Sequence, residues 1–186
     1  MKEIQTPAAP APVRKPFYKK WWFWVLVVIV ILAAIGSSSP TPHKVGTTST
    51  QTQPTTFKVG DQIKMGDTVL TVTSVNRNWK SANEFDTPSN PNDVYVTVSV
   101  SLQNQGTGTI DLSSFWDFKL EDATGVIHDQ SLGGVGLNAL STGSLAAGGK
   151  TSGDILFEVP QNATSNMALM YQPLFSGNQP VKVELQ

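Results

Sequence analysis

The chain has 186 residues, enough for one or two domains, and charged residues make up only 15% of it. It contains no cysteine, which excludes disulfide bonds, thiolate metal sites, a cysteine nucleophile and a lipid-modified cysteine. Only two histidines are present, so a site built from several imidazoles is excluded as well.

The net charge of −1 combines a basic N-terminal region with an acidic body. Residues 1–36 carry five basic side chains and one acidic side chain. Residues 57–186 carry seven basic and thirteen acidic side chains, a net charge of −6. Nucleic acid is therefore not expected as a partner, because phosphate binding needs a clustered basic surface.

A transmembrane helix is predicted over residues 21–39, after a basic, proline- and alanine-rich tail at 1–20. Residues 21–36 contain no polar side chain and give about 24 Å of helix, which the three serines that follow extend to the length of a span. Lysines and tryptophans at the start of the segment fit the membrane interface, and the positive charge places the N-terminus in the cytoplasm. We expect a single-pass protein of the cell membrane with an extracellular C-terminal domain.

A cleaved signal peptide is the alternative for the same segment. Ala34 and Gly36 are small residues suited to cleavage before Ser37, which would give a secreted protein. The long basic region and the row of tryptophans favour a retained anchor. Residues 40–56, rich in Ser, Thr and Pro, are predicted to form an extended, unstructured linker.

Residues 57–186 are predicted to form one all-β domain, an immunoglobulin-like β-sandwich. Residues 94–103 alternate without interruption between aliphatic and polar side chains, so one face of this strand is buried and a charge at Thr97 on the other face is tolerated. Gly66-Asp67 predicts a type II′ hairpin. Without a disulfide, Trp116, Phe118 and Phe157 are expected to hold the core by packing. The other predicted strands are 62–65, 68–75, 115–121, 126–127, 154–159, 167–171 and 181–185.

The order of several segments carries a resemblance to a known family. The anchor and linker precede Phe57-Lys58-Val59-Gly60-Asp61, then Asp93-Val94-Tyr95-Val96 and Phe115-Trp116-Asp117-Phe118. The chain resembles the immunoglobulin-like extracellular domain of unknown function in membrane-anchored or lipoprotein surface proteins of Gram-positive bacteria. That domain is similar in fold to the mycobacterial immunoprotective extracellular protein. The resemblance implies a fold and a location, but no activity and no site residues.

Apparent catalytic and cofactor motifs lack the context that they need. Residues 144–151 nearly match a phosphate-binding loop, but a strand is predicted where that loop requires a helix. His128 is predicted to be a surface residue. The carboxylates of residues 117–129 and 84–93 lack calcium-loop spacing and are interpreted as solvated or capped turns. We therefore expect no cofactor, no metal and no catalytic residue.

The candidate binding loop is the long polar segment 76–92, with Trp79, Phe85 and Asp86 as its candidate residues. Loops carry function more often than framework strands. The alternative is that both rings fold back onto the sandwich. A second long loop is predicted at 130–143. The leading hypothesis is a non-catalytic binding module for a protein or cell-envelope ligand; the alternatives are an envelope hydrolase that uses acidic residues and a regulatory subunit of a membrane complex.

Overall fold

The computed structural model describes residues 43–44, 56–173 and 180–186. The chain divides into Met1–Ser38 and Ser39–Gln186, and every described residue belongs to the second unit. The predicted tail, the predicted transmembrane helix and most of the predicted linker therefore lie outside the described residues. Within the described part of the chain, no helix is long and apolar enough to span a membrane.

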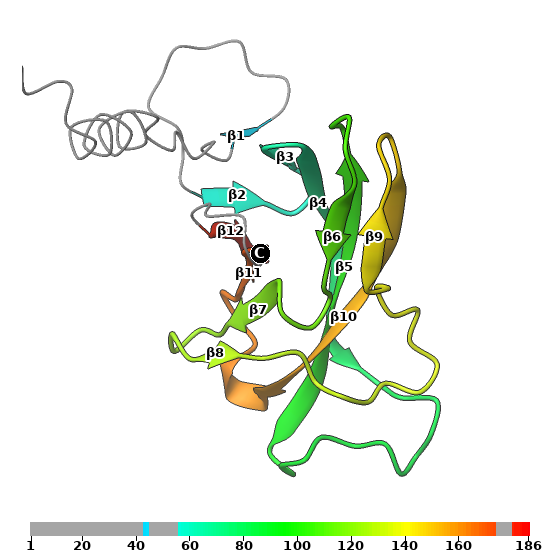
Figure 1. Cartoon of the computed structure of the whole chain (residues 1–186). Helices are drawn as coiled ribbons and strands as arrows, with labels where there is room; N and C mark the ends of the chain where they lie inside the picture. Colours follow the sequence, from blue (N-terminus) through cyan, green and yellow to red (C-terminus); the bar gives the residue numbers. More distant parts are fainter. Residues whose placement is uncertain (1–42, 45–55, 174–179) are drawn as a thin grey trace, which may run out of the picture. The chain divides into compact units, whose positions relative to one another are not determined.

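Two five-stranded sheets face each other in a β-sandwich (Figure 1), which confirms the predicted all-β class. Sheet A has the order β1 (His43–Lys44), β3 (Gln62–Met65), β4 (Thr68–Trp79), β5 (Asp93–Asn104) and β10 (Lys150–Pro160). Sheet B has the order β2 (Thr56–Lys58), β12 (Val181–Glu184), β11 (Ala168–Tyr171), β7 (Phe118–Glu121) and β8 (Ile127–His128). A separate pair is formed by β6 (Ile110–Leu112) and β9 (Gly143–Leu145), and one 3-10 turn, η2, spans Gln161–Ala163.

The core between the sheets follows from the alternation along β5. Val96, Val98, Val100 and Leu102 are all buried, as the sequence predicts. They belong to one cluster with apolar residues of both sheets, including the fully buried Phe118. The first hairpin also has the predicted form: Met65 pairs with Thr68, and Gly66 takes a φ of 59°, the sign that a type II′ turn requires.

The prediction that Trp116 packs in the core is wrong. Its side chain is 59% exposed, whereas Phe118 and Phe157 are buried. The strand begins only at Phe118, because residues 113–117 form a turn closed by a hydrogen bond from Asp117 N to Ser113 O. Trp116 therefore does not share the inward face that Phe118 takes.

The prediction of an open outer face on β5 is also wrong at its N-terminal half. Tyr95 and Thr97 point away from the core, yet both are only 4% exposed. Their neighbour on β10, Leu156, is 1% exposed on the same face. This half of the outer face is therefore covered, and the segments that cover it form the candidate site.

One pair of residues in the predicted linker is a strand. His43 and Lys44 of β1 pair antiparallel with Lys64 and Ile63 of β3. The edge of sheet A is thus extended by residues that precede the predicted domain. Composition alone did not indicate this strand, because the surrounding Ser, Thr and Pro residues are typical of unpaired segments.

Candidate functional site

Two long connections that are about 50 residues apart in the sequence form one surface. Residues 80–92 join β4 to β5, and residues 129–142 lie between β8 and β9. Figure 1 shows them side by side, and a backbone hydrogen bond of 2.9 Å from Ala82 N to Val135 O links them directly. We call the surface formed by residues 80–92 and 130–137 the loop platform.

Asp86 is the main link between the two loops. Its Oδ2 accepts hydrogen bonds from the backbone N–H groups of Gly134 and Val135, both at 2.8 Å, and from Ser81 Oγ at 2.7 Å. Its Oδ1 accepts a hydrogen bond from the Tyr95 hydroxyl at 3.1 Å. These donors, with the Val135 N–H first, lower the pKa of Asp86 to about 2. The carboxylate is therefore ionised at every physiological pH.

Glu158 on β10 makes a second link. Its carboxylate accepts hydrogen bonds from Ser89 N at 3.0 Å, in the first loop, and from Ser131 Oγ at 2.8 Å, in the second. Ser131 N also donates to Leu156 O at 2.8 Å. Burial, together with the neighbouring Asp86, raises the pKa of the Tyr95 hydroxyl to about 12, so this group remains a donor. The loops are thus fixed to each other and to the sheet.

The backbone of the second loop suits this arrangement. Gly134 has a φ of 88°, which only glycine adopts without strain, and its N–H points at Asp86. The segment Leu132-Gly133-Gly134-Val135-Gly136 is therefore a glycine-rich turn around a carboxylate.

The three candidate residues have three different environments. Trp79 is the last residue of β4, half-buried, and its ring packs edge-to-face on Tyr95 with centroids 6.1 Å apart. Asp86 is directed into the platform by its hydrogen bonds. Only Phe85 faces solvent, with 86% of its surface exposed. Of the two rings in the segment, one therefore packs against the sandwich and the other does not.

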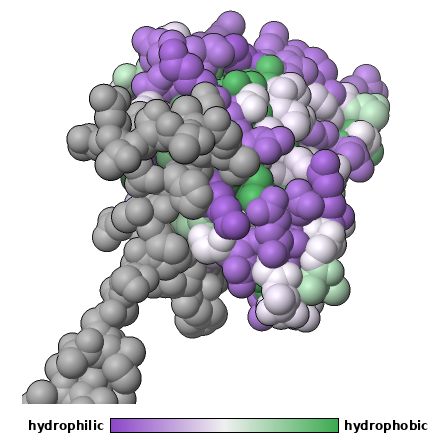
Figure 2. Space-filling model, turned by 90° about the horizontal axis from the view of Figure 1, so that it is seen from above, coloured by the Kyte–Doolittle hydropathy of each residue, from purple (hydrophilic) through white to green (hydrophobic). Residues whose placement is uncertain are grey.

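Two further apolar side chains of the platform are exposed and were missed from the sequence. Leu132 is 84% exposed and Val135 is 53% exposed, and both belong to the second loop. The sequence feature that could have indicated them is the presence of these two apolar residues within a glycine-rich segment. In contrast, Figure 2 shows that hydrophilic residues dominate the face seen from above, where apolar residues form only small separate groups.

The remaining motifs have structural roles. Residues 146–149 form a turn that leads into β10, the strand predicted after this motif, so the near-match to a phosphate-binding loop lacks its helix. The prediction that His128 is a surface residue is wrong. Only 17% of its side chain is exposed, and its Nε2 lies 2.8 Å from Asp122 Oδ2. Burial alone would raise the pKa of Asp122, but hydrogen bonds from His128, Thr124 and Val126 lower it to about 2.

Other carboxylates of the same hairpin also have partners within the protein. Glu121 pairs with Lys182 at 2.8 Å, and Asp129 pairs with Lys119. Among the residues that the structure describes, no group of three or more potential metal-binding side chains occurs.

Residues 57–182 match the family model described as a domain of unknown function, DUF4352. The chain belongs to this family. No functionally curated protein matches its sequence.

Several solved structures share the fold. The YjhA protein of Bacillus subtilis is 22% identical, with a TM-score of 0.54, over 70% of this chain and 99% of that chain. The secreted protein MPT63 of Mycobacterium tuberculosis is 14% identical, with a TM-score of 0.52, over 73% and 99%. A conserved hypothetical protein of Bacillus anthracis is 11% identical, with a TM-score of 0.51, over 70% and 95%. At these identities the likeness concerns the fold alone.

Proposed function

We propose that the DUF4352 domain of this chain is an extracellular, non-catalytic binding module of immunoglobulin-like type that captures a protein partner through the loop platform. The observation that carries the proposal is the exposure of Phe85, Leu132 and Val135 on two loops that Asp86 holds together. A preorganised surface loses less conformational entropy on binding than two independent loops do. Exposed large apolar side chains on such a surface are typical of contact sites between proteins.

The acidic charge of the domain favours a protein partner with basic groups and disfavours an acidic polymer or an anionic membrane. In the first loop, Lys80 is accompanied by Glu84 and by the ionised Asp86. The whole of residues 57–186 carries a net charge of −6. Electrostatic complementarity accordingly favours a partner whose apolar contact area is rimmed by Lys or Arg.

The proposed location rests on the sequence and on the neighbours. The apolar segment at residues 21–39 is the proposed membrane anchor, and the linker then presents the domain outside the cell. MPT63, which shares the fold, is described as a secreted protein. Protease treatment of intact cells should release a fragment that begins between residues 37 and 57. A mature N-terminus at Ser37 without added protease would instead indicate a secreted protein.

Site-specific photocrosslinking tests the platform. The full-length chain is expressed in its own cells with a photoreactive phenylalanine at position 85, or at position 116 as the control, since Trp116 is also an exposed aromatic residue. We expect a discrete protein adduct from position 85 and none from position 116. Leu132→Ala and Asp86→Ala should each reduce that adduct several-fold. Equal adducts from both positions, or no effect of Leu132→Ala, would rule out the platform as the contact site.

A further inference from the structure

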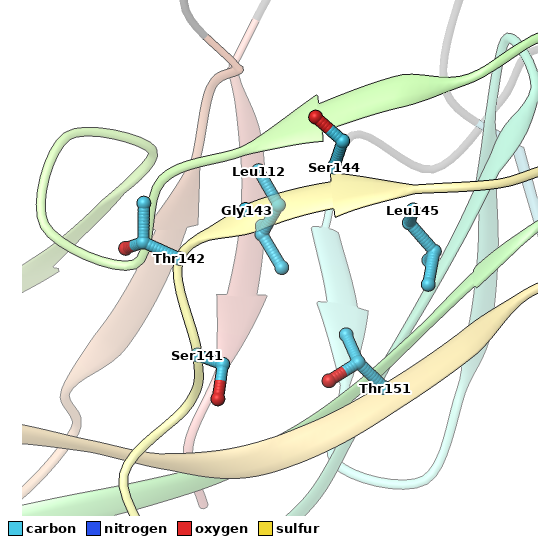
Figure 3. A pocket seen from close by; sticks show the side chains of 7 residues that line it. All are labelled: Leu112, Ser141, Thr142, Gly143, Ser144, Leu145 and Thr151. Atoms are coloured by element: carbon cyan, nitrogen blue, oxygen red, sulfur yellow. The ribbon is translucent and has the colours of Figure 1, made fainter.

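A second candidate site, separate from the loop platform, is a cavity between β9 and β10 (Figure 3). Its volume is about 160 Å³. None of its lining residues carries a charge; they are Leu112, Ser141, Thr142, Gly143, Ser144, Leu145 and Thr151. The cavity is therefore lined by four hydroxyl groups and no charged group, although the domain as a whole is acidic.

The cavity arises because the chain leaves the edge of β10 and then returns to it. Leu140 N donates to Asp154 O at 3.0 Å, so the chain still follows β10 at that point. The following residues pair with β6 and not with β10. The turn at residues 146–149, closed by Gly149 N to Ala146 O at 2.9 Å, then leads back into β10. A gap remains between the two strands.

Two of the four hydroxyl groups are free to bind a ligand. Thr142 Oγ1 accepts a hydrogen bond from Ser114 N, and Ser144 Oγ donates to Asp111 Oδ1 at 2.7 Å. In Figure 3 the hydroxyl oxygens of Thr142 and Ser144 point away from the gap. Within the described part of the chain, Ser141 and Thr151 have no hydrogen-bond partner for their hydroxyl groups. Both line the gap in Figure 3, where Thr151 lies opposite Leu145 and Ser141 lies at the other end.

Backbone groups of β10 add to these hydroxyls. The N–H and C=O of Asp154 bond to Asn138 and Leu140, on the side away from β5. Since backbone direction alternates along an antiparallel strand, Ser152 also turns its N–H and C=O away from β5, toward the gap. Neither group has a backbone partner within the described residues. The wall of the gap thus offers donors and acceptors close to two leucines.

We propose that this cavity binds a single sugar residue of a neutral glycan. The hydroxyl groups of a sugar both donate and accept, which matches Ser141, Thr151 and the backbone of Ser152. Its apolar ring face matches Leu112 and Leu145. A volume of about 160 Å³ equals roughly five water molecules and lies below the ~300–1,000 Å³ of sites for drug-sized ligands, so one ring fits. The uncharged lining and the net charge of −6 disfavour anionic glycans.

Nuclear magnetic resonance titration of the labelled full-length protein in detergent micelles tests this site. The probes are three neutral trisaccharides: maltotriose, cellotriose and triacetylchitotriose. We expect saturable shifts in the amide signals of residues 141–145 and 150–153 with at least one probe. Thr151→Val and Ser141→Ala should each weaken binding roughly two- to tenfold, the effect of one neutral hydrogen bond.

The matched control is Ser152→Ala. Its side chain lies next to Thr151 but on the opposite, exposed face of sheet A, and the substitution keeps the backbone groups. It should leave the affinity unchanged within twofold. No shift with any trisaccharide, or equal affinity in Thr151→Val with an unchanged melting temperature, overturns the proposal. So does a response of the same amides to an extended Val/Thr peptide and not to sugars. Phe85→Ala should not affect this titration, so the two sites fail or succeed separately.

Discussion

The core between the two sheets and the loop platform are stabilised by different interactions. In the core, apolar side chains of β5, β7 and β10 pack against one another, and their identity matters less than their burial and volume. In the platform, two carboxylates bind backbone and hydroxyl groups of two distant loops. An unpaired charge would therefore destabilise the core, whereas the platform depends on its two carboxylates.

This difference separates stability from recognition. A substitution in the core should change the free energy of unfolding of the whole domain. A substitution in the platform should change the position of Phe85, Leu132 and Val135 while the sandwich stays folded. Three predictions, ordered by the size of the expected effect, test the comparison.

The largest effect is expected from a charge on β5. Val98→Asp should unfold the domain, because an unpaired buried charge costs several kcal/mol against a typical stability of about 5–15 kcal/mol. Thr97→Asp should also lower the melting temperature strongly, since Thr97 is buried beside Leu156. Gln103→Asp, on the same outer face but beside Lys150, should be tolerated. Circular dichroism melting curves check the order, and a melting temperature for Thr97→Asp equal to that for Gln103→Asp would contradict the covered face.

A smaller but still large effect is expected at Phe118. Phe118→Ala should destabilise the domain by about 3–5 kcal/mol, because the buried ring stacks on Tyr171 with centroids 4.8 Å apart. Trp116→Ala, two residues earlier and exposed, should change stability by about 0.5 kcal/mol or less. Urea unfolding of the two variants provides the measurement. A larger loss for Trp116→Ala than for Phe118→Ala would place the tryptophan in the core after all.

Substitution of Asp86 should have the smallest effect of the three on the stability of the whole domain. Its effect on the order of the loop platform should be the largest. Its pKa of about 2 in the folded protein lies below the ordinary 3.8, so its stabilisation is complete above about pH 4 and is lost as the pH falls toward 2. Asp86→Ala should remove this acid-dependent component and speed hydrogen exchange at the amides of Gly134 and Val135. Asp129→Ala, which removes an exposed ion pair with Lys119, is the control and should leave those amides protected. Unchanged exchange in Asp86→Ala would show that the loops hold together without the carboxylate.

The sequence predicted the long strands because their signal is local. Ten alternating residues within β5 suffice to define its buried face, and Gly66 defines the first hairpin without further information. Short strands such as β6 and β9 contain too few residues for a period to emerge. β1 is equally short and lies among residues with a linker composition.

The platform was only partly predictable because its contacts are not local. A polar loop with two aromatic rings drew attention to residues 76–92, but the sequence gives no means of separating the half-buried Trp79 from the exposed Phe85. The role of Asp86 depends on two backbone N–H groups that lie 48 and 49 residues further along the chain. Every residue except proline has a backbone N–H group, so the sequence does not show which of these groups a carboxylate binds. Only the three-dimensional structure shows it.

The pairing of β2 with β12 has a consequence for how the domain acquires its structure. Phe57 lies opposite Val183 in this parallel pair, so a strand at the beginning of the domain obtains its partner from the end. Contacts with so large a sequence separation form slowly, because a long segment must be closed before any hydrogen bond is gained. During synthesis, sheet B therefore stays incomplete until residues 181–184 have emerged. The domain should fold late and as a whole, and a chain that stops before β12 should lack a stable sheet B.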